Sequence, residues 1–154
     1  MRALLLAALL ALRAGTAPAQ DGCWLLCSEE LDLVGAEAQA RLEGWLGAAL
    51  PPGSEVEHLL EGGFQDAFVQ ARLEVDGAGL AALLGALGLT AADLDAVEPW
   101  PDAPADPPWW DWQGRKGVKA AEGRLPDLPY ASIHVAPAPG EPGRWTAYLW
   151  AFQT

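Results

Sequence analysis

The residues best suited to bind a ligand stand together near the middle of the sequence, at Trp109-Trp110-Asp111-Trp112. Six of the eight tryptophans follow residue 99. A tryptophan offers a large apolar ring and one N–H group, so such a cluster either fills a core or forms a recognition surface. The cluster is followed at once by cations. The candidate binding residues are therefore Trp109, Trp110, Asp111, Trp112, Arg115 and Lys116.

Two aspartates are the strongest candidates for acid–base chemistry. Asp66 follows Gly62-Gly63-Phe64, and Asp111 lies between tryptophans, as carboxylates do in sugar-binding clefts. Glycoside hydrolysis would need the two carboxyl groups about 5 to 10 Å apart in one cleft. Asp66 also suits the cap of a turn. A small carboxylate-dependent hydrolase is therefore a hypothesis, but not the leading one.

Other catalytic patterns are missing from the sequence. It contains no Gly-x-Ser-x-Gly elbow, no phosphate-binding glycine loop and no His-Glu-x-x-His motif. Ser132 and His134 fall on one face of an expected strand, about 7 Å apart, which is too far for direct proton transfer. His58, beside Glu57 and Glu61, could form a pH-sensitive contact. We expect no catalytic residue, no metal site and no cofactor, and therefore no enzyme.

Residues 1–19 have the layout of a secretory signal peptide. Arg2 precedes the apolar run Ala3–Leu12, and Ala17-Pro18-Ala19 resembles a cleavage site. The run is about half the 20 or so residues that cross a bilayer. A retained anchor and lipid attachment at Cys23 are the alternatives, although Gln20-Asp21-Gly22 frames that cysteine poorly. We expect a periplasmic or secreted protein with no membrane span after cleavage.

Cys23 and Cys27 are the only cysteines. In an exported chain such a pair is most simply a disulfide. A metal or redox role and two free thiols are the alternatives.

The formal net charge is −12, and loss of Arg2 and Arg13 with the signal peptide would make it more negative. A strongly acidic chain is repelled by nucleic acid and by anionic membranes. It favours solubility or a basic protein partner.

Residues 20–154 are the right length for one domain. Residues 36–50 show a helical stripe, ended by Pro51-Pro52-Gly53. Residues 54–60 fit either a strand or a helix. We prefer the strand, because the Gly62-Gly63 turn would pair it with the clear alternation of residues 67–75.

The second half begins with expected helices at residues 77–87 and 90–97, the latter opened by the capping-box spacing of Thr90 and Asp93. A proline-rich segment then leads to the tryptophans, and residues 113–124 are expected to be an exposed basic loop or a short irregular turn. Strands are expected at residues 130–136 and 144–153. The last of these is apolar on both faces and should be central.

These elements predict an α+β fold: an antiparallel sheet of about four strands, with helices packed on one side and a Pro/Trp-rich crossover loop. The loop should lie across the face that carries Tyr148, Trp150 and Phe152. One of Trp109 and Trp110 should then be buried, and the other partly exposed.

Two stretches carry a resemblance to a known group of proteins. One runs from Leu50-Pro51 through Gly62-Gly63-Phe64-Gln65-Asp66 into the alternating strand. The other joins Pro107-Pro108-Trp109-Trp110 to the segments 130–135 and 145–149. Over residues 50–154 the chain resembles small exported bacterial proteins of unassigned function, secreted or lipid-anchored. The resemblance implies an extracytoplasmic α+β domain and carries over no site residues.

The leading hypothesis from the sequence is an exported, non-enzymatic domain that binds a protein partner, for example an inhibitor or immunity protein that masks a basic toxin. The first alternative is a small-ligand domain that uses Trp109–Trp112 to bind a carbohydrate or an aromatic compound. The second alternative is the hydrolase built on Asp66 or Asp111.

Overall fold

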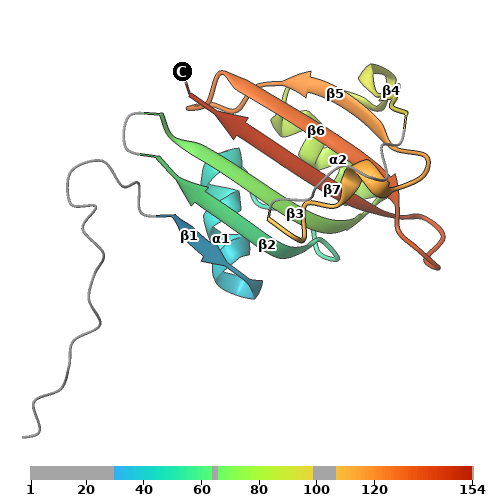
Figure 1. Ribbon diagram of the computed structural model, residues 1–154, viewed down its shortest axis with the longest axis horizontal. Helices are drawn as coiled ribbons and strands as arrows, with labels where there is room; N and C mark the ends of the chain where they lie inside the picture. Colours follow the sequence, from blue (N-terminus) through green and yellow to red (C-terminus); the bar gives the residue numbers. More distant parts are fainter. Residues whose placement is uncertain (1–29, 64–65, 99–106, 154) are drawn as a thin grey trace, which may run out of the picture.

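The computed structural model describes residues 30–63, 66–98 and 107–153. Residues 1–19, the expected signal peptide, and the pair Cys23 and Cys27 lie outside the described residues, so their expected roles stay predictions. One seven-stranded antiparallel sheet has the order β1-β2-β3-β7-β6-β5-β4 (Figure 1). Its strands are β1 (Leu31–Leu33), β2 (Glu55–Gly62), β3 (Phe68–Asp76), β4 (Asp95–Ala96), β5 (Lys119–Gly123), β6 (Tyr130–Pro137) and β7 (Arg144–Phe152).

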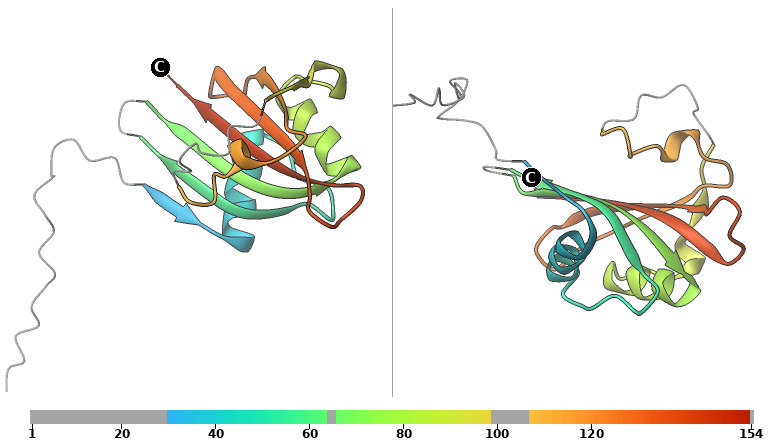
Figure 2. Two further views of the ribbon diagram at one scale, coloured as in Figure 1. Left: turned by 45° about the vertical axis from the view of Figure 1, so that its right-hand side comes forward. Right: turned by 90° about the horizontal axis from the view of Figure 1, so that it is seen from below.

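Both helices, α1 (Gly35–Leu46) and α2 (Gly77–Ala86), lie against one face of this sheet, and the loop that carries the tryptophans lies on the other (Figure 2). The fold is therefore α+β with helices on one side, as the sequence predicts. The helix-facing layer holds the core. Ala71, Leu73, Ile133, Ala147 and Leu149 from the strands pack with Leu42 and Leu83 from the helices, all with no measurable exposure. Each buried leucine contributes about 1.5–3 kcal/mol through the hydrophobic effect.

The central strand is β7, between β3 and β6. Its odd-numbered residues Ala147, Leu149 and Ala151 are fully buried in the helix-facing core. Tyr148 is also fully buried, but on the other face, beneath the tryptophan loop. The expectation of a central strand covered on both sides is confirmed.

The helix α1 ends at Leu46 rather than at Leu50 as expected from the prolines. Gly47 follows with φ of 67°, a left-handed conformation that ends the helix and that glycine adopts without steric cost. Helix α2 begins as expected, because the side chain of Asp76 accepts a hydrogen bond from the backbone N–H of Gly79 at 2.8 Å.

The expected four strands are confirmed. They include the segment 54–60, for which strand and helix were both open and which forms most of β2. The number of strands is nevertheless wrong, because three short ones were missed. Residues 31–33 form β1, where no element is expected from the sequence. Residues 90–97 form a single 3₁₀ turn, Ala91–Asp93, followed by β4 instead of a helix. Residues 113–124 contain a 3₁₀ turn and the strand β5 rather than only an exposed loop. Strands of two to five residues are too short for a hydrophobic period to reveal them.

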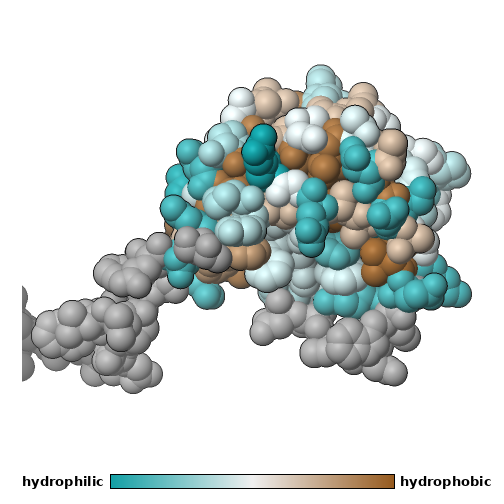
Figure 3. Space-filling model, turned by 90° about the horizontal axis from the view of Figure 1, so that it is seen from above, coloured by the Kyte–Doolittle hydropathy of each residue, from teal (hydrophilic) through white to brown (hydrophobic). Residues whose placement is uncertain are grey.

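No helix in the described part of the chain is long and apolar enough to cross a membrane. Figure 3 views the molecule from above Figure 1, and there hydrophobic side chains form small areas separated by hydrophilic ones.

Candidate functional site: the loop-bearing face of the sheet

The face opposite the helices is organised in rows of side chains that run across the strands. The row nearest the tryptophan loop joins His58, Arg72, Tyr148 and His134, which are register partners on β2, β3, β7 and β6. The next row is Gln70, Trp150 and Ser132, and the outermost is Phe68, Phe152 and Tyr130. Register partners on adjacent strands lie on the same face, so each row is a continuous surface. The first row is called the covered row below, and the other two are called the open rows.

Asp111 holds the tryptophan loop (residues 107–118) onto the covered row. Its carboxylate accepts a hydrogen bond from the hydroxyl of Tyr148. The Nη2 atom of Arg115 lies 3.1 Å from Asp111 Oδ2, and Nη1 of Arg72 lies 3.5 Å from Oδ1. Arg72 also forms an ion pair with Glu57 at 2.7 Å.

These contacts determine the ionisation of Asp111 and Tyr148. Burial acts to raise the pKa of Asp111, but the hydroxyl of Tyr148 and the guanidinium groups of Arg115 and Arg72 outweigh it and hold that pKa below its usual value. Burial, together with the hydrogen bond to Asp111, raises the pKa of Tyr148. The pair therefore stays a phenol and a carboxylate near neutral pH.

The three tryptophans of the loop cover the row in order. Trp109 stacks on His58 with ring centroids 5.1 Å apart, and Trp112 stacks on His134 at 3.7 Å. Between them, Trp110 meets Tyr148 edge to face at 5.6 Å. Trp110 is buried, at 7% exposure, whereas Trp109 and Trp112 are partly exposed. The expected lid, with one of Trp109 and Trp110 buried and the other partly exposed, is confirmed.

The contact between loop and sheet leaves several buried polar atoms without a hydrogen-bond partner among the described residues. They are Nδ1 of His58 and His134, Nε1 of Trp109 and Trp112, and Oε1 of Gln113. Burial also lowers the pKa of His134 to about 4, so this imidazole is neutral over most of the pH range. A buried atom without a partner costs about 1–3 kcal/mol, so the loop is held less tightly than its aromatic contacts suggest.

Beside the loop, the open rows form the wall of a groove of about 560 Å³, here called the aromatic groove. Five of its lining residues are aromatic and come from the loop, β6 and β7: Trp110, Trp112, Tyr130, Trp150 and Phe152. Polar side chains stand between them, namely Gln113, Glu122, Ser132 and His134. Tyr130 stacks on Phe152 at 5.3 Å, and Trp150 lies 5.0 Å from the same ring. Tyr130 and Trp150 keep 51% and 42% of their surface exposed.

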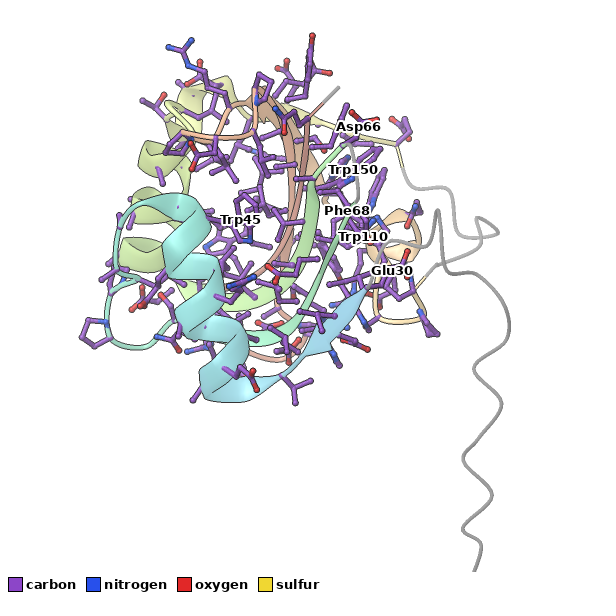
Figure 4. All side chains as sticks on the ribbon, turned by 90° about the vertical axis from the view of Figure 1, so that its left-hand side faces the viewer. Glu30, Trp45, Asp66, Phe68, Trp110 and Trp150 are labelled. Atoms are coloured by element: carbon purple, nitrogen blue, oxygen red, sulfur yellow. The ribbon has the colours of Figure 1, made fainter. Side chains whose placement is uncertain are left out.

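A second groove, of about 790 Å³, lies on the other side of Trp150 and Phe152 and is called the acidic groove. Glu30, Asp32 and Asp66 line it, together with Phe68 and Gln70. Figure 4 shows Glu30, Asp66, Phe68, Trp110 and Trp150 on one side of the sheet, and Trp45 on the helix side. The two grooves share Trp150 and Phe152 as a common wall.

The structure brings only some of the predicted site residues together. Trp110 and Trp112 line the aromatic groove, but Trp109 does not. Arg115 is occupied by Asp111, and Lys116 is exposed and lines neither groove. Asp66 lines the acidic groove, whereas Asp111 is engaged under the loop, so the two carboxylates share no groove among the described residues.

Sequence analysis missed Tyr130, Phe152 and Phe68 as site residues. The available signal was the alternation within each strand: Tyr130, Ser132 and His134 lie on one side of the first strand, and Trp150 and Phe152 lie on one side of the second. Only the pairing of the strands shows that both sets lie on the same face.

Within residues 30–63, 66–98 and 107–153, no three His, Cys, Asp or Glu side chains are grouped so that they could hold a metal ion. No protein-family model, curated protein or solved structure matches this chain.

Proposed function

We propose that this protein binds a carbohydrate in the aromatic groove. The observation that carries the proposal is the composition of the groove: aromatic rings from three separate segments form its walls, and hydroxyl, amide and carboxylate groups stand between them. Sugar rings present apolar C–H faces that stack on aromatic side chains, while their hydroxyl groups need hydrogen-bond donors and acceptors nearby. A volume of about 560 Å³ falls within the usual range for small-ligand sites.

The buried polar atoms at the edge of the groove support the same proposal. Trp112 Nε1 is a donor, Gln113 Oε1 is an acceptor, and Nδ1 of the neutral His134 can act as either. A sugar hydroxyl that reached these atoms would give them hydrogen bonds that the described residues do not provide. The ring of Trp112 covers His134, so this contact requires Trp112 to move. Tryptophan fluorescence should therefore report binding.

Titration with a panel of soluble oligosaccharides, followed by fluorescence and calorimetry, tests the proposal. Trp150→Ala and Tyr130→Ala should each weaken binding about five- to tenfold, because a stacking ring contributes about 1 kcal/mol. Leu31→Ala is the matched control: Leu31 is exposed to 43%, almost as much as Trp150, and its register partner Glu61 contacts α1 on the helix side. The proposal fails if no oligosaccharide binds at millimolar concentration, or if Leu31→Ala and Trp150→Ala have equal effects.

The basic protein partner expected from the sequence is the second candidate. It is favoured by the net charge of −12 and by the exposed rings of Tyr130 and Trp150, since aromatic residues are enriched in protein interfaces. Such a partner should be released by Trp150→Ala and by high salt, but not by an oligosaccharide.

A further inference from the structure

The shared wall of the two grooves makes them parts of one binding surface. Phe68, Phe152 and Tyr130 form the outermost row across β3, β7 and β6, and Trp150 lies beside Phe152 on the same strand. A ligand in the aromatic groove that extends across Trp150 and Phe152 therefore enters the acidic groove. Because the two grooves adjoin along one face of the sheet, this surface suits a chain of several rings rather than one compact molecule.

The charge along this surface has one sign. The acidic groove is lined by Glu30, Asp32 and Asp66, and the aromatic groove by Glu122. All four are exposed, and none forms an ion pair with another described residue. No lysine or arginine of the described chain lines either groove. The surface therefore disfavours an anionic ligand and attracts a cationic one.

We propose that the ligand is an oligosaccharide of amino sugars with free, protonated amines, and that the acidic groove is the subsite that receives these amines. This inference rests on the proposed carbohydrate binding in the aromatic groove. The rings of the sugar stack on Trp150 and Phe152. The ammonium groups lie near Asp32 and Asp66, and also near the face of Phe68 or Trp150, where a cation is attracted by the ring.

A cationic peptide would satisfy the carboxylates but makes less use of the aromatic strip, because its flexible side chains lose entropy when they are ordered on a flat surface. A neutral sugar would use the strip but not the carboxylates. Exposed ion pairs are individually weak and are screened by salt, so we expect a preference of a few fold rather than an absolute requirement for charge.

The test compares soluble glucosamine oligomers with N-acetylglucosamine oligomers of the same length and linkage, at a mildly acidic pH at which the free amines are charged. The two probes differ in charge and share the same ring. The glucosamine oligomer should bind about three- to tenfold more tightly at low salt, and the ratio should approach one at high salt.

A pair of double variants identifies the subsite. Asp32→Asn with Asp66→Asn should bring the ratio of the affinities for the glucosamine and N-acetylglucosamine oligomers to about one. Glu37→Gln with Asp127→Asn makes the same change in net charge at exposed positions that line neither groove, and should retain the preference.

The possible failures are distinguishable. If both oligomers bind equally and Trp150→Ala weakens both, the amine subsite is wrong and the carbohydrate site stands. If neither oligomer nor any other sugar binds, the proposed function itself is wrong. If an oligolysine of equal charge binds as tightly and is insensitive to Trp150→Ala, simple charge attraction explains the binding and the amine subsite is overturned.

Discussion

The hydroxyl of Tyr148, on the central strand, donates a hydrogen bond to the carboxylate of Asp111, in the loop that joins β4 to β5. This is the contact at which the loop meets the middle of the sheet. Arg115 and Arg72 hold the same carboxylate from the loop and from β3. Trp109 and Trp112 are thereby placed over His58 and His134, and Trp112 forms an edge of the aromatic groove.

Removal of this hydrogen bond should loosen the loop without unfolding the sheet. Tyr148→Phe should lower the free energy of unfolding by about 1–2 kcal/mol, because the phenol is fully buried and its partner is charged. Urea denaturation measures this change. A double-mutant cycle with Asp111→Asn should show a coupling of about 1 kcal/mol or more. Tyr130→Phe is the control and should change stability by less than about 0.5 kcal/mol, since its side chain is half exposed. Additive effects of Tyr148→Phe and Asp111→Asn would contradict this role.

His134 should make stability depend on pH in a defined window. Burial lowers its pKa from 6.5 to about 4, so the unfolded chain binds a proton between these values and the folded chain does not. Stability should therefore fall as the pH decreases from about 6.5 to about 4, and this loss should be complete below the folded pKa. His134→Phe keeps a ring under Trp112 but cannot titrate. In urea denaturation at a series of pH values, this variant should lose less stability than the wild type within that window.

The stability contributed by the charged contacts of Asp111 should be lost only at a pH below the window in which His134 titrates. The pKa of Asp111 lies below the ordinary 3.8, so its charged contacts persist through the window in which His134 titrates. A wild-type curve with no slope between pH 6.5 and 4 would contradict the burial of His134.

On the helix side of the sheet, Glu61 is a buried charged residue with two side-chain partners on α1. It is 5% exposed and accepts hydrogen bonds from Arg41 Nε at 2.7 Å and from Trp45 Nε1 at 2.8 Å. Burial acts to raise the pKa of Glu61, but these two donors and the charge of Arg41 outweigh burial and hold that pKa below its usual value, so the carboxylate is charged near neutral pH. Glu61→Leu should destabilise the protein by about 1–3 kcal/mol, because the partly buried indole N–H loses its acceptor.

Thermal denaturation with Glu37→Leu as the control tests the role of Glu61. Glu37 is exposed and lies on the same helix as Arg41, and its replacement should cost less than about 0.5 kcal/mol. Equal effects of the two substitutions would show that the Glu61 contacts contribute nothing specific.

Two glycines should respond to the same substitution in opposite directions. A Cβ atom at Gly123, the last residue of β5, would lie 2.7 Å from the carbonyl oxygen of Leu87. Gly123→Ala should therefore destabilise by about 1–3 kcal/mol, because two backbone segments must separate. At Gly85, in α2, a Cβ meets no atom within 4 Å, so Gly85→Ala should stabilise by about 0.5–1 kcal/mol. Chemical denaturation of the two variants checks both signs, and equal signs would contradict the close approach of Leu87 to Gly123.

The sequence predicts α1, α2, β3, β6 and β7 because each is long enough to display its own period, whereas β2 was preferred because a glycine turn could pair it with β3. The alternation of residues 67–75 was sufficient for β3, and two apolar faces were sufficient to place β7 at the centre of the sheet. The short strands β1, β4 and β5 have no readable period of their own. They form because a longer neighbour offers unpaired backbone groups, and that cause lies outside the segment itself.

The candidate site was predictable only in part, for a related reason. Trp110 and Trp112 attract attention by composition alone, and the proline-rich segment suggests that they cross the sheet. Tyr130 and Phe152 are ordinary strand residues until β6 is paired with β7, and only then do their rings stack. The sequence also cannot show that Asp111 is engaged by Arg72, which is 39 positions away along the chain.

The position of β7 has a consequence for the order in which the chain can fold. Strands β1 to β3 and strands β4 to β6 form two half-sheets, and β7 is the only strand that pairs with both. Until residues 144–152 are synthesised, β3 and β6 each present an unpaired edge, and the residues of both open rows lie on two separate half-sheets. Completion of the sheet is thus a late insertion into the middle rather than growth at an edge. The incomplete chain exposes two unpaired strand edges, which favour aggregation until β7 is in place.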